Sequence, residues 1–168
     1  WDAIAYEVTY IVDGSIYSDP RYVDFGTPIG EPTVPTKLGH TFAGWAPAVD
    51  SEATKAVTYV AQWEVNSYDV NYMIKGEDGD EDELFKTQSF NYGDPLTVTA
   101  DKPAKTGYNF GGWVDANGAT YKFPATMPAE DITVYAKFTP RNYEAKFYEE
   151  ADADAPYDIT NADFDAPV

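Results

Sequence analysis

The sequence predicts a mostly β protein built from small tandem repeat domains with little or no helix. Three segments open alike, at Tyr6, Tyr68 and Tyr143. In these segments bulky apolar side chains alternate with polar ones, which is the two-residue period of a strand with one buried face. No segment carries an apolar stripe of helical period over about ten residues or more. Helix is therefore limited to a short turn near residues 29–38 or 96–106, where prolines restrict it further.

Each repeat is predicted to begin and end with a strand that has one apolar face. Every second residue of a strand points to the same side of the sheet, and we expect the apolar sides to form the core. The core side of the opening strands carries Tyr6, Val8 and Tyr10, and again Tyr68, Val70 and Tyr72. The core side of the closing strands carries Val57, Tyr59, Ala61 and Trp63, and again Ile132, Val134, Ala136 and Phe138.

A Gly-x-x-Phe-x-Gly-Trp motif occurs twice, at residues 39–45 and 107–113. In each repeat an aromatic-Gly-x-Pro turn precedes it, beginning at Phe25 and at Tyr92. The Phe and Trp of the motif are three residues apart, so a regular strand would place them on opposite faces. Two interpretations remain open: a bulge turns both rings inward, or one ring covers the joint to the next repeat.

Matching the repeats along the chain predicts the domain boundaries. Residues 1–5 are interpreted as the end of a preceding repeat, 6–65 and 66–140 as repeat domains, and 141–168 as the opening strands of a further, truncated repeat. The joints are too short to act as flexible tethers, so we expect neighbouring repeats of the same chain to be each repeat's partners.

Composition excludes several classes of protein. The chain has 168 residues, with 11 Lys and Arg against 29 Asp and Glu, and a net charge of −18. That balance argues against nucleic acid as a partner and against direct contact with an anionic membrane surface, because both need a basic surface. A 16% aromatic content excludes a disordered acidic tail. Without cysteine the chain has no disulfide, thiolate zinc site or cysteine nucleophile.

Taken together, the opening strand, the aromatic-Gly-x-Pro turn, a Pro-x-Lys-x-Gly segment, the Gly-x-x-Phe-x-Gly-Trp motif and the closing strand resemble the Listeria–Bacteroides repeat, the B-repeat type of internalins. The resemblance covers essentially all of residues 1–168. It implies a small α+β, β-grasp-like domain that occurs in tandem in exported bacterial proteins at the cell surface or cell wall. It also implies a stalk, spacer or adhesive role with neither catalysis nor a cofactor.

Nothing in the sequence indicates catalysis. The single histidine, His40, stands where the other copy of the motif has Tyr108, so the position is not reserved for proton transfer. A catalytic triad also needs an activated nucleophile and an orienting acid, and the Gly-x-Ser-x-Gly elbow is absent from the sequence. We therefore predict that the protein is not an enzyme.

An acidic run carries the one candidate metal site. Asp78, Asp80 and Asp82 alternate as oxygen ligands of a calcium loop do, although the run lacks the glycine and the final glutamate of an EF-hand. The favoured interpretation is a solvated hairpin tip whose charges protect a strand edge. Calcium binding is the alternative.

Tyrosines outside the matched framework are the candidate ligand contacts. They are Tyr17, Tyr22, Tyr121 and Tyr157. Such rings could stack on a host or environmental glycan or contact a protein, or they could simply be half-buried packing residues.

The leading functional hypothesis is a non-enzymatic spacer in an extracellular bacterial surface protein, presenting a distal domain. The alternative is an adhesive module that binds host or environmental glycans or proteins. An adhesive array should repeat its surface aromatics at equivalent positions, whereas Tyr17, Tyr22 and Tyr121 do not match between repeats. A third hypothesis is self-association through exposed strand edges.

Overall fold

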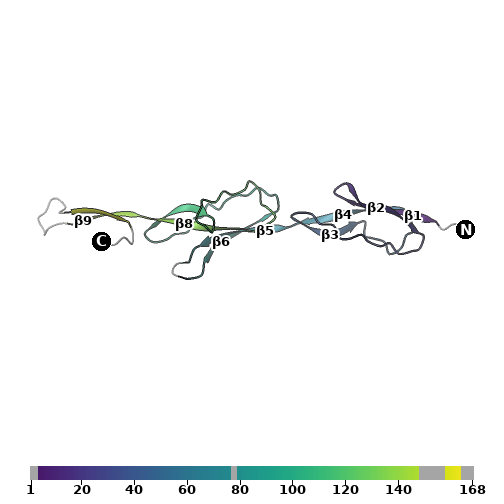
Figure 1. The fold of residues 1–168 in the computed structure, drawn as a ribbon, viewed down its shortest axis with the longest axis horizontal. Coiled ribbons are helices and arrows are strands. Elements are labelled where there is room, and N and C mark those ends of the chain that lie inside the picture. The colour runs from purple at the N-terminus through teal and green to yellow at the C-terminus, as the bar shows by residue number, and fades with distance from the viewer. Residues whose placement is uncertain (1–3, 77–78, 148–157, 164–168) are drawn as a thin grey trace. The chain divides into compact units, whose positions relative to one another are not determined.

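The computed structural model describes residues 4–76, 79–147 and 158–163. The chain divides into two compact units: unit 1 comprises Trp1–Ser67 together with Asn91–Gly93, and unit 2 comprises Tyr68–Phe90 and Asp94–Val168. The strands, shown in Figure 1, are β1 (Ala5–Val12), β2 (Ser15–Asp24), β3 (His40–Ala46), β4 (Val57–Val65), β5 (Ser67–Ile74), β6 (Glu83–Asn91), β7 (Tyr108–Val114), β8 (Ile132–Pro140), β9 (Asn142–Phe147) and β10 (Asp158–Asp163).

Each repeat folds into its own four-stranded sheet, and the two sheets have the same strand order. The first has the order β2-β1-β4-β3 and the second the order β6-β5-β8-β7, while β9 and β10 form a separate antiparallel pair. The opening and closing strands of each repeat, β1 with β4 and β5 with β8, are parallel neighbours at the centre of the sheet. The described residues contain no helix, which confirms the mostly β prediction.

The two segments in which the sequence permitted a short helical turn are irregular in the structure. Residues 29–38 and 96–106 run without helix. Proline at positions 32, 35 and 103 removes backbone donors and fixes φ, so a hydrogen-bonded helix is not supported there. The family resemblance implied a small α+β domain, whereas the described residues form strands and loops with no helix.

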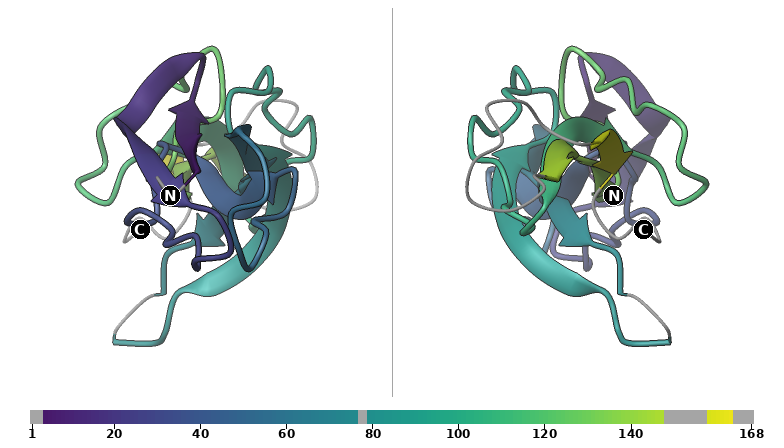
Figure 2. Two further views of the ribbon diagram at one scale, coloured as in Figure 1. Left: turned by 90° about the vertical axis from the view of Figure 1, so that its right-hand side faces the viewer. Right: turned by 90° about the vertical axis from the view of Figure 1, so that its left-hand side faces the viewer.

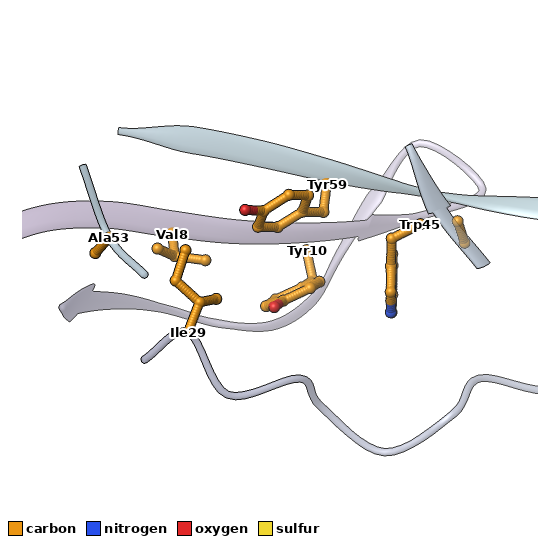
Figure 3. Packing of buried hydrophobic residues seen from close by; sticks show 7 residues of the cluster. Val8, Tyr10, Ile29, Trp45, Ala53 and Tyr59 are labelled. Carbon is orange, nitrogen blue, oxygen red and sulfur yellow. The ribbon is translucent and has the colours of Figure 1, made fainter. Parts of the chain in front are cut away.

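The core lies on one face of each sheet and is built largely from aromatic rings. In unit 1 the side chains of Val8, Tyr10 and Tyr59 are at most 1% exposed. Figure 3 shows Tyr10 and Tyr59 from the two central strands beside Trp45 from β3. Ring centroids of Tyr10 lie 4.8 Å from Trp45 and 5.2 Å from Tyr59. These contacts confirm the apolar face predicted for the opening and closing strands.

Two loops close the core where a sheet alone would leave it open to water. In unit 1, Gly26 N donates to Ala53 O at 2.9 Å, and Ala53 N donates to Thr27 O at 2.9 Å. This pairing seats Ile29 and Ala53 against Val8, as Figure 3 shows. In unit 2 the matching bond runs from Met127 N to Asp94 O at 2.9 Å, and Met127 is 1% exposed.

A bulge decides between the two interpretations of the Phe and Trp rings. The register between β3 and β4 shifts between Phe42 and Gly44, and the register between β7 and β8 shifts at the matching place. Gly44 supplies a φ of 118° at the bulge. Both rings consequently pack toward the core, with the centroids of Phe42 and Trp45 5.2 Å apart. The inward alternative is the one adopted.

Candidate functional site

Tyr17 has a packing counterpart in the second repeat, although the sequence suggested none. Its ring centroid lies 6.3 Å from that of Trp45, and the ring of Phe85 lies 6.2 Å from that of Trp113. The two residues thus occupy the same place beside the motif tryptophan. Sequence matching missed this because the β1–β2 ladder has register shifts that displace the residues of β2.

The other candidate tyrosines differ in their surroundings. Tyr22 is 72% exposed on the edge strand β2. Tyr121 packs beside the second core, with its ring centroid 4.9 Å from that of Phe123. Tyr157 lies outside the described residues. The structure therefore brings none of these described tyrosines together, and Tyr22 is the one with a large open surface.

The acidic run includes residues 77–78, which lie outside the described residues, and its described part projects away from the strands in both views of Figure 2. Asp82 accepts a hydrogen bond from Gly76 N at 3.0 Å and lies 3.5 Å from Lys75 Nζ. The backbone donor at Gly76 lowers the pKa of the Asp82 carboxyl. Asp80 is exposed, and Asp78 lies outside the described residues. Among the described residues no three acidic, histidine or cysteine side chains converge on a metal position, so calcium binding stays a prediction.

A shallow groove of about 260 Å³ lies beside the β5–β6 connection of unit 2. Lys105, one of its walls, also places its ammonium group 4.3 Å from the centroid of the Tyr108 ring. The groove is lined by side chains of both charges, so it does not present a uniform field to an ionic ligand. Its charged lining residues are Lys75, Asp80, Glu81, Glu83 and Lys105.

The first motif glycine forms a socket for an aromatic ring within unit 1. The Tyr92 ring lies so close to Gly39 that a Cβ atom there would overlap it. Tyr92 belongs to unit 1, together with its two neighbours in the chain. The Tyr92 and His40 rings lie 5.8 Å apart, edge to face, and His40 Nδ1 donates to Leu38 O at 2.8 Å. Tyr92 N donates to Asn66 O at 2.8 Å. His40 thus packs against a ring, and neither of these contacts supplies a nucleophile.

Buried tyrosine hydroxyls join the core to the covering loops. Tyr72 OH donates to Gln88 Oε1 at 2.8 Å and accepts from Thr99 N at 3.2 Å. Tyr59 OH accepts from Asp50 N at 3.1 Å. Burial is the main reason why the pKa values of Tyr10, Tyr59 and Tyr72 lie above their usual value.

These hydroxyls predict a loss of stability in alkali. A raised folded-state pKa means that the stabilisation is complete below the unfolded pKa of about 10 and is lost as pH rises toward the folded value. We expect the urea midpoint of unfolding to fall above about pH 10. In Tyr72→Phe the fall of the unit 2 urea midpoint with rising pH should be less steep, because the buried hydroxyl that titrates has been removed. An equal slope in Tyr72→Phe and the parent chain would contradict this assignment.

No helix among the described residues is long and apolar enough to cross a membrane.

The chain matches a known family along most of its length. The profile of the Listeria-Bacteroides repeat domain matches residues 6–67 and again residues 68–137. Internalin H of Listeria monocytogenes is 36% identical over 148 residues, which cover 80% of this chain and 25% of that protein. Two proteins of Evansella cellulosilytica with membrane-protein names, one of them described as Gly-rich, are 29% and 28% identical over 88% of this chain. The chain spans a quarter or less of the length of these relatives. The chain therefore belongs to the Listeria–Bacteroides repeat family, of which it carries two tandem copies.

Proposed function

We propose that the two repeats are a non-enzymatic spacer in an extracellular bacterial surface protein, where they hold a distal domain away from the cell. The observation that carries this proposal is the parallel pairing of the first and last strands of each repeat. Because β1 and β4 run in the same direction side by side, the chain enters a repeat at one end of the sheet and leaves it at the other.

The distance that one repeat covers follows from the register. Val8 lies opposite Val57, with Ala5 before it on β1 and Val65 at the far end of β4. At about 3.3 Å per residue, the path from Ala5 to Val65 spans roughly 35 Å. Val70 lies opposite Ile132 in the second repeat, which gives the same span between the ends of β5 and β8. Each repeat therefore advances the chain by a full strand length instead of returning it to its starting point.

The relatives support the same role. This chain corresponds to a quarter or less of each relative, as expected of a module within a longer protein. Internalin H and the membrane-protein names of the other two relatives support a location at the bacterial surface. The high negative charge would keep neighbouring spacers apart and soluble.

The adhesive alternative depends on surface aromatics that recur, and the most exposed candidate does not recur. Tyr22 lies opposite Glu7 on β1. The residue that matches Glu7 in the second repeat is Asp69, whose carboxylate accepts a hydrogen bond from Ser89 at 2.5 Å. A serine therefore takes the place of Tyr22, which leaves the second repeat without that ring.

Two measurements test the spacer. The chain has no cysteine, so exposed sites at Ser67 and Arg141 can be changed to cysteine and spin-labelled without background. We expect a single narrow distance distribution near 35–40 Å, about one strand span plus the label linkers.

The parent chain should also give no saturable binding to a panel of glycans, mucin and matrix proteins. Saturable binding that Tyr22→Ala abolishes, while Tyr121→Ala leaves it intact, would replace the spacer with an adhesive module.

A further inference from the structure

The turn at Phe25 has the same backbone arrangement as the turn at Tyr92. Phe25 N donates to Ile4 O at 2.7 Å, and Tyr92 N donates to Asn66 O at 2.8 Å. The glycine that follows each aromatic residue has a positive φ, 75° in the first turn and 81° in the second. The two rings are therefore attached at equivalent backbone positions. In each turn the backbone N–H of the aromatic residue is hydrogen-bonded to the residue two positions before the opening tyrosine of the repeat.

The surroundings of the two rings differ. Tyr92 is half-buried in unit 1, where it covers Gly39 and lies beside His40. Phe25 is 62% exposed and the neighbouring Ile4 is 65% exposed. The Phe25 ring meets Tyr6 edge to face, with the centroids 6.4 Å apart. Most of its surface nevertheless stays in water and forgoes the free energy that burial of the ring would supply.

The backbone that receives Tyr92 occurs in both repeats. Gly39 has a φ of 69° and its carbonyl accepts a hydrogen bond from Asn66 N at 2.9 Å. Gly107 has a φ of 80° and its carbonyl accepts one from Arg141 N at 2.8 Å. A left-handed glycine at this place allows an aromatic ring to lie directly on the backbone, because a side chain would occupy that space.

We propose that Phe25 is a docking residue for a further Listeria–Bacteroides repeat that precedes it in the same chain, and that the first motif glycine of that repeat receives its ring. The Tyr92 ring on Gly39 is the occupied example of this arrangement. The partner is recognised by a glycine with a positive φ followed by a ring such as His40 or Tyr108; in the occupied example the incoming Tyr92 ring covers the glycine and meets His40 edge to face. This inference deepens the spacer proposal and rests on it for its biological purpose.

The test places a repeat that carries the first motif glycine directly before the repeat that carries Phe25. A chain with a second copy of residues 6–67 inserted in line before residue 6 places a Gly39 socket ahead of the downstream Phe25. Phe25→Trp in that downstream copy serves as the probe, and acrylamide quenching is measured as the difference from the same chain without the probe. We expect quenching of the probe indole to fall severalfold relative to Phe25→Trp in the original chain, with a blue-shifted emission.

The matched control blocks the socket without unfolding it. Asparagine tolerates the left-handed backbone, so Gly39→Asn in the upstream copy should keep the sheet and fill the seat. Quenching of the probe indole should then return to its value in the original chain while the far-ultraviolet circular dichroism spectrum is unchanged. Equal quenching in the chains with and without the added copy would overturn the proposal. Shielding in the original chain that grows with concentration would also overturn it, because the socket would then come from another molecule. These outcomes do not depend on ligand binding, so they are separable from a failure of the spacer proposal.

Discussion

Replacing Trp113 with alanine is expected to lower the stability of the second repeat by about 3–5 kcal/mol and to lower its urea midpoint strongly. The indole is 8% exposed and its ring centroid lies 4.7 Å from that of Tyr72 and 5.1 Å from that of Phe110. Removing a buried tryptophan costs about 3–5 kcal/mol. A domain of this size without disulfides has a stability of only about 3–10 kcal/mol, so the loss takes from about a third to all of it. The measurement is urea unfolding followed by near-ultraviolet circular dichroism.

The first repeat provides the reference within the same molecule. Trp45 and Trp63 are retained in Trp113→Ala, and the circular dichroism that they contribute should persist. Trp113→Phe should lose less stability, because a phenylalanine ring fills part of the same volume. A urea midpoint for unit 2 that Trp113→Ala leaves within error of the parent would show that the ring does not support the core.

Changing Gly112 to alanine is expected to destabilise the second repeat by about 1–3 kcal/mol, because its backbone lies in a region that L side chains avoid. Gly112 has a φ of 108°, and a Cβ built there would meet nothing within 4 Å. The cost is therefore backbone strain at the bulge, without steric overlap. The free energy of unfolding from urea titration measures it.

The adjacent glycine is a matched control. A Cβ on Gly111 would lie 3.5 Å from Lys137 O, an ordinary contact distance, and the matching residue of the first repeat is already Ala43. Gly111→Ala should therefore be neutral or stabilise by about 0.4–1 kcal/mol through a smaller unfolded-state entropy. Similar losses in Gly111→Ala and Gly112→Ala would refute the assignment of the bulge strain to one residue.

Local periodicity was enough to predict the strands and their buried faces. Alternation predicts that Val8 and Tyr10 share a face, and the structure buries both. It predicts the same for Tyr59 and Ala61 in the closing strand, and both are buried. This works because the side of a strand on which a residue lies depends only on its position in the local chain. The family resemblance likewise rests on short motifs whose spacing is visible in the sequence, and the family profile bears it out.

The tertiary structure decided which segments meet. The parallel pairing of the first and last strands joins Val8 to Val57, and no local pattern specifies that partner. The bulge at Gly44 and the packing of Tyr17 on Trp45 both depend on register between strands. The seat of Tyr92 on Gly39 depends on two turns that are distant in sequence. Alternation thus determined the inward faces, whereas strand order, register and ring partners were determined only by packing, since these contacts form between residues that no local period connects.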